Sequence, residues 1–100
     1  MIDRINKNEE RLDRISKVVK ELEISLNNFK DCKKDLNYLN NYYGSSNWFK
    51  DKRLYENKKI TNIKAGVLSE DAVWFLLEDI DELLNDMKLL VDNFKIEKRG

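Results

Sequence analysis

The 100-residue chain has no histidine, no proline, one cysteine and three glycines. Because histidine is the usual general base and metal ligand near neutral pH, its absence argues against an enzyme and against a transition-metal site. We therefore expect no catalytic residue, no metal and no cofactor. The single Cys32 excludes an internal disulfide and is typical of a reducing compartment, so we expect a cytoplasmic protein. The absence of proline and the scarcity of glycine favour long helices.

The chain also lacks a net charge and a long apolar run. Nineteen basic residues balance nineteen acidic ones, so no overall charge attracts nucleic acid, and we do not expect nucleic acid as a partner. No segment approaches the ~20 apolar residues of a membrane-spanning helix, and the polar N-terminus is unlike a signal peptide. We expect no membrane association and a single helical domain over residues 1–100.

The clearest pattern predicts a helix over residues 69–96. Ser69 is a typical N-cap residue, and Glu70 and Asp71 follow it in the first turn, where the helix dipole favours acidic side chains. Apolar residues then recur at alternating steps of four and three, as on a helix face that packs against another helix. This stripe consists of Val73, Leu77, Ile80, Leu84, Met87, Val91 and Phe94. We interpret the stripe as core.

A similar stripe predicts a first helix over residues 2–43. Its apolar residues are Ile5, Leu12, Ile15, Val19, Leu22, Leu26 and Phe29, with the polar Asn8 at one position of the same seam. Beyond Phe29 the phase slips by one position, because Cys32 follows after a second successive step of three. Such a slip overwinds or bends a helix, so the sequence leaves open whether the helix is continuous or kinked near residues 27–32.

The segment between the two long helices completes an all-α fold. Gly44 is suited to end the first helix, a short helix is predicted over about 46–56, and 57–68 reads as irregular. We expect a small antiparallel helical bundle or a coiled-coil-like hairpin. At ~1.5 Å per residue the first helix is ~60 Å long and the last ~40 Å, so part of the first lacks an internal partner. We therefore expect a homodimer.

A cluster of aromatic and basic residues around the glycine turn is one candidate site. Aromatic rings stack on bases, and lysine and arginine hold phosphates, so the cluster could bind a small anionic nucleotide-like ligand or a partner. Aromatic residues beside a glycine turn are more often the plug at the end of a small bundle, and we favour that interpretation. The candidate residues are Tyr42, Tyr43, Gly44, Trp48, Lys50, Lys52 and Arg53.

An acidic stripe on the last helix is a second candidate surface. Glu78, Glu82 and Asp86 repel one another at four-residue steps, with no basic residue among them, so they either face solvent or meet a cationic partner. Residues 44–66 carry six basic and two acidic residues, whereas residues 67–100 carry four and nine. The basic middle segment could therefore lie against the acidic helix or serve as a binding surface.

Three short motifs connect the chain with a known family. The stretch Tyr42-Tyr43-Gly44-Ser45, the helix start Gly66-Val67-Leu68-Ser69-Glu70-Asp71 and the stretch Leu76-Leu77-Glu78-Asp79 resemble the family catalogued as domain of unknown function 4298. The resemblance covers essentially the whole chain. It implies a short all-helical protein from a bacterium or a phage, and it brings no established activity.

The functional expectation follows from these features together. The enrichment in lysine, asparagine and isoleucine is what AT-rich codons produce, which fits a bacterial or phage origin. We expect a non-enzymatic small helical binding protein, acting as a stoichiometric inhibitor of a bacterial host protein of the anti-defence type. Two alternatives stay open: sequestration of a small anionic nucleotide-like ligand near the Tyr-Tyr-Gly turn, and a self-associating scaffold.

Overall fold

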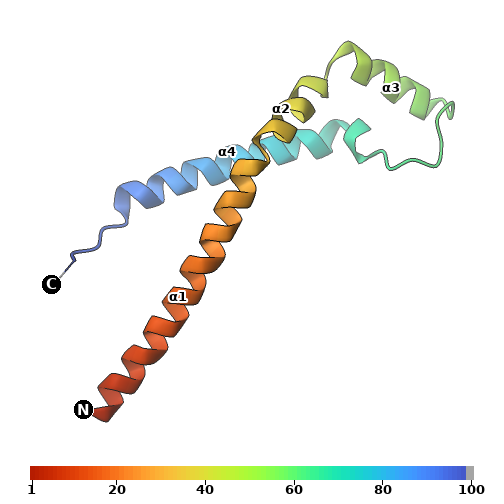
Figure 1. Cartoon of the computed structure of the whole chain (residues 1–100). Coiled ribbons are helices and arrows are strands. Elements are labelled where there is room, and N and C mark those ends of the chain that lie inside the picture. Colours follow the sequence, from red (N-terminus) through yellow and green to blue (C-terminus); the bar gives the residue numbers. More distant parts are fainter. Residues whose placement is uncertain (99–100) are drawn as a thin grey trace. The chain divides into compact units, whose positions relative to one another are not determined.

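The computed structural model describes residues 1–98, and all regular structure within them is helical (Figure 1). The predicted all-α class is confirmed. The helices are α1 (Ile2–Asp31), α2 (Lys33–Tyr42), α3 (Ser46–Glu56), the 3-10 helix η1 (Gly66–Leu68) and α4 (Glu70–Asn93). None of these helices is both long enough and apolar enough to cross a membrane. The chain forms two compact units, Met1–Tyr38 and a second unit that begins at Leu39.

The first unit is dominated by α1, which ends at the position where the sequence pattern slips. The backbone N–H of Cys32 donates to the carbonyl of Phe29, three residues back, at 3.1 Å. This tighter bond is the local overwinding that two successive steps of three require. The helix resumes at Lys33, so the segment predicted as one helix over 2–43 consists of two helices that meet at Cys32.

The second unit is built around three apolar side chains, which we call the Trp48 core. Trp48 on α3 is 3% exposed, Leu68 on η1 is 7% exposed, and Val73 on α4 is 4% exposed. They are the buried apolar residues within the described part of the chain. Figure 1 shows the chain leaving α3 through a long loop and returning to the start of α4. The core therefore holds α3 against η1 and the first turn of α4.

Three residues in the connections of the second unit are left-handed: Gly44, Lys58 and Asn62, of which Asn62 has a φ of 59°. Gly44 has a φ of +76° and lies in the turn that the Ser45 N–H closes on the carbonyl of Tyr42 at 3.0 Å. Lys58 has a φ of 58° just beyond α3. The N–H of Lys59 donates to the carbonyl of Leu54, and that of Lys58 to the carbonyl of Tyr55, the bonding pattern of a Schellman motif. Lysine thus holds a position that glycine usually occupies.

The start of α4 confirms the predicted cap, and its end differs from the prediction. The Ser69 hydroxyl accepts from the N–H groups of Asp71 and Ala72, at 3.2 and 3.4 Å. The helix ends at Asn93, whereas the pattern predicted about residue 96. The Asn93 amide donates to the carbonyl of Leu89 at 2.8 Å, and Phe94 has an extended backbone. The helix ends because the backbone of Phe94 is extended.

Most of the apolar stripe on α4 lies outside the Trp48 core. Only Val73 of the predicted stripe is buried; Leu77, Ile80 and Met87 are half-buried. Leu84 and Val91 are exposed to 47% and 77%. The predicted pairing of this stripe with the first helix would join the two units, and it stays a prediction.

Candidate functional site

The ring of Trp48 is enclosed by its own neighbours. Its indole N–H donates to the backbone carbonyl of Val67 at 2.8 Å. The rings of Tyr43 and Phe49 meet it edge-on, with centroids 5.2 and 4.9 Å away. The ammonium group of Lys52 lies 5.2 Å from the ring centroid, within cation–π range. A ring that is 3% exposed offers no free face for a base, so Trp48 acts here as a structural anchor.

The two tyrosines also make bonds inside the second unit. The Tyr43 hydroxyl donates to the backbone carbonyl of Glu70 at 2.5 Å, which links the turn after α2 to the first turn of α4. The Tyr42 hydroxyl donates to a carboxylate oxygen of Asp51 on α3 at 2.7 Å. This hydrogen bond to the carboxylate raises the pKa of Tyr42 to about 12, with smaller contributions from burial and from the Asp51 charge.

The positive charge of Lys52 is matched by acidic side chains. Its Nζ lies 2.6 Å from Oε1 of Glu70 and 3.7 Å from Oε1 of Glu56. The hydrogen bond to Glu70 raises the pKa of Lys52, and the same bond lowers the pKa of Glu70. The basic middle segment therefore does meet the acidic helix, through this ion pair. Lys50 and Arg53 are exposed on α3.

The candidate cluster is thus divided by the structure. Tyr42, Tyr43, Trp48 and Lys52 come together around the junction of α3 with η1 and α4, and Gly44 supplies the turn that brings the tyrosines there. Two of their partners are backbone carbonyls, which a sequence pattern cannot predict. The contact between Lys52 and Glu70 was more predictable, because the two segments carry opposite net charges. These contacts fit a structural cluster that closes the end of a small bundle better than they fit a site on which bases stack.

The second candidate surface lies on α4. Glu78, Glu82 and Asp86 are all exposed and form a row along the helix. At 3.6 residues per turn, Glu78 and Glu82 lie on the side of α4 opposite the apolar stripe, whereas Asp86 lies between that side and Leu83. No group of three histidine, cysteine, aspartate or glutamate residues among residues 1–98 is placed to hold a metal ion. The acidic row is therefore a solvent-facing strip of negative charge.

The apolar face of α4 is also exposed within the second unit. Its exposed leucines and valine recur at steps of seven residues in two neighbouring rows, and each is at least 43% exposed. They are Leu76, Leu83, Leu84, Leu90 and Val91. Leu89 is also exposed, to 51%, but its position on the helix places it on the acidic side. A helix with this pattern has one apolar and one acidic face available for contact.

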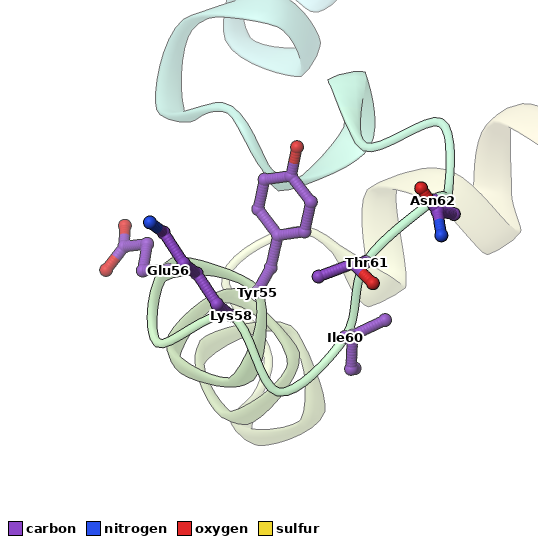
Figure 2. Close-up of a pocket in the computed structure, with 6 residues that line it drawn as sticks. All are labelled: Tyr55, Glu56, Lys58, Ile60, Thr61 and Asn62. Carbon is purple, nitrogen blue, oxygen red and sulfur yellow. The ribbon is translucent and has the colours of Figure 1, made fainter.

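A shallow hollow between the end of α3 and the following loop holds none of the candidate residues. It is lined by Tyr55, Glu56, Lys58, Ile60, Thr61 and Asn62 (Figure 2). Figure 2 shows Glu56 and Lys58 on one side of it, while Ile60, Thr61 and Asn62 lie along the loop on the other. The hollow is open, and its lining combines two opposite charges with apolar and neutral side chains.

Together, these features define a small all-helical protein with a compact aromatic anchor and long apolar helix faces. The chain belongs to the family described as Domain of unknown function (DUF4298), whose model matches residues 5–90. The resemblance seen in the three sequence motifs is thereby confirmed. No curated protein and no solved structure matches the chain.

Proposed function

We propose that the protein is a non-catalytic binding protein whose α4 occupies an apolar groove on a protein partner. The observation that carries the proposal is the exposure of the apolar face of α4. Within the second unit the helix is anchored at its first turn by Val73, while Leu84 and Val91 remain 47% and 77% exposed. Amphipathic helices bind apolar grooves through anchors at this spacing.

The charges of α4 indicate what the groove carries. Asp79 and Asp86 each follow an exposed leucine, Leu76 and Leu83, by three residues, so they border the apolar face on one side. A partner that receives the leucines would bring its own rim against these carboxylates. We therefore propose a groove with lysine or arginine along that rim. Such rim charges mainly speed association and make it sensitive to salt.

The proposed biological role is that of a stoichiometric inhibitor in a bacterial cell. The amino-acid composition, which is typical of AT-rich codons, supports a bacterial or phage origin. The single cysteine supports a partner in the cytoplasm. Because inhibition by occupation needs a surface and no catalytic group, it fits a chain without histidine. The nucleotide-ligand alternative draws less support, since Trp48 is buried and Lys52 is held by Glu70.

Two aspartate substitutions on opposite sides of α4 test the proposal. The full chain with Leu84→Asp and the full chain with Leu89→Asp are immobilised beside the unmodified chain, and bacterial lysate is passed over each. Both leucines are about half exposed, so each variant should fold, which overlaid thermal unfolding curves would verify. We expect one protein to be retained in equal molar amount by the unmodified chain and by Leu89→Asp, and to be lost with Leu84→Asp.

Contact mapping and salt complete the experiment. Cross-links from the retained protein should fall on α4, and raising the salt concentration should weaken retention because the rim contacts are screened. Two results would overturn the proposal: retention that Leu84→Asp leaves unchanged, or cross-links that fall outside α4.

A further inference from the structure

The helix α1 carries a seam that nothing covers within its own unit. No residue of α1 is buried, and the six aliphatic seam residues from Ile5 to Leu26 are 36–60% exposed. The seam continues to Phe29 and thus spans more than three heptads, long enough for a coiled coil. We propose that α1 pairs with α1 of a second copy of the chain, as a parallel, in-register two-stranded coiled coil over residues 2–31.

The width of the seam indicates a single helix as partner. The positions that flank it on one side are Arg4, Arg11, Val18 and Ser25, and those on the other side are Glu9, Ser16, Glu23 and Lys30. Because all but one of these are polar, the apolar stripe is only as wide as a two-stranded interface requires. The stripe of α4 is wider, since Leu76, Leu83 and Leu90 flank it. In width, the seam of α1 therefore matches the seam of a second α1 better than it matches the stripe of α4.

Asn8 sets the orientation. It lies within the seam, where its amide donates to the carbonyl of Arg4 at 2.8 Å and its oxygen accepts from Arg11 at 3.1 Å. The amide has a second N–H, and in a parallel, in-register pair it faces the same amide of the second copy. In an antiparallel pair with fully overlapping seams, Asn8 would lie opposite Leu26, where that N–H has no acceptor. A polar residue inside an apolar seam specifies the register, and the N–H left without an acceptor disfavours the antiparallel pair.

Charge is compatible with this arrangement. In the parallel pair, Arg4 lies beside Glu9 of the second copy, and the symmetry repeats the contact. No like charges meet along the flanks, because Arg11 lies beside Ser16. The antiparallel pair also joins opposite charges, Glu9 with Lys30, so charge does not decide the direction and Asn8 does.

A disulfide placed in the seam tests both partner and direction. The full chain with Cys32→Ser and Leu26→Cys is oxidised and compared with a control that carries Cys32→Ser and Ile24→Cys. Residue 24 lies on the outer side of α1 and is 54% exposed. Only a parallel, in-register pair brings residue 26 opposite residue 26. We expect most of the Leu26→Cys chain to become a covalent dimer that a reductant reverses, and little of the control to do so.

Sedimentation of the unmodified chain gives the second measurement. We expect twice the 12.0 kDa mass of one chain. Leu84→Asp on α4 should dimerise equally well, so this inference and the proposed function can fail separately. A monomeric mass at the highest attainable concentration would refute the inference. Equal cross-linking of the two cysteine variants would refute it as well, and so would a dimer in which neither forms a disulfide.

Discussion

Replacing Trp48 by phenylalanine should loosen the second unit, whereas the same replacement at Trp74 should not. Trp48 is 3% exposed and its indole N–H is bonded to the carbonyl of Val67. Trp74 is 50% exposed on the first turns of α4. The same substitution is therefore made at one buried and one exposed tryptophan, which makes Trp74→Phe a matched control.

The magnitude follows from what Trp48→Phe removes. A hydrogen bond between neutral groups contributes about 0.5–1.5 kcal/mol net to the free energy of unfolding. The smaller ring also leaves unfilled space within the Trp48 core, which costs roughly 1–2 kcal/mol more. We expect a loss of about 2–3 kcal/mol in the free energy that opens the second unit. Trp74→Phe should stay within about 0.5 kcal/mol, as surface substitutions usually do.

Hydrogen exchange can measure this loss within the second unit, because the amides of α3 exchange when the Trp48 core opens. A loss of 2–3 kcal/mol corresponds to exchange roughly 30- to 150-fold faster, since 1.4 kcal/mol is a factor of ten. Peptides covering Ser46–Glu56 should show this acceleration in Trp48→Phe alone. If both variants exchanged at the same rate, Trp48 would not be the anchor of the unit.

Two further predictions concern backbone conformation and pH. Gly44→Ala should lower the free energy of unfolding by about 1–2 kcal/mol, because its φ is +76° although an added Cβ would meet no atom within 4 Å. Lys58→Gly should raise the free energy of unfolding by about 0.5–1 kcal/mol, because it removes left-handed strain. The two variants should therefore shift the urea midpoint in opposite directions, and shifts in the same direction would contradict both predictions. Because the pKa of Tyr42 is raised from 10.0 to about 12, its stabilising contribution is complete below pH 10 and is lost as the pH rises toward 12. Ultraviolet titration should show this late ionisation, and Asp51→Asn should lower the pKa of Tyr42 back toward 10.0, with only the effect of burial remaining; an unchanged titration curve would exclude the Tyr42–Asp51 bond as the cause.

The sequence predicted the elements whose causes are local. Ser69 caps α4 because its hydroxyl reaches the N–H groups of the first turn, and that geometry needs only adjacent residues. The interruption at Cys32 lies where two steps of three occur in succession. The end of α4 was placed too late, since the apolar spacing continues through Phe94 although the backbone of Phe94 is already extended.

The candidate site was predicted less completely, because its contacts join distant residues. The pattern found Tyr43 and Trp48 but not their acceptors, since a backbone carbonyl has no residue identity to recognise. The burial of Trp48 also depends on η1, which forms within a segment predicted as irregular. The contact between Lys52 and Glu70 was a partial exception, because the segment charges predicted that the basic middle segment could lie against the acidic helix, without naming the pair.

The choice of acceptors by Trp48 and Tyr43 has an evolutionary consequence. Both donors end on main-chain oxygens, at Val67 and Glu70. Many side chains could replace Val67 without removing its carbonyl, whereas neither aromatic could be lost without breaking its bond. Tolerance to mutation at this junction should therefore be uneven: the two donors are constrained by identity and Val67 only by the path of its backbone, while Glu70 also holds Lys52 through its carboxylate.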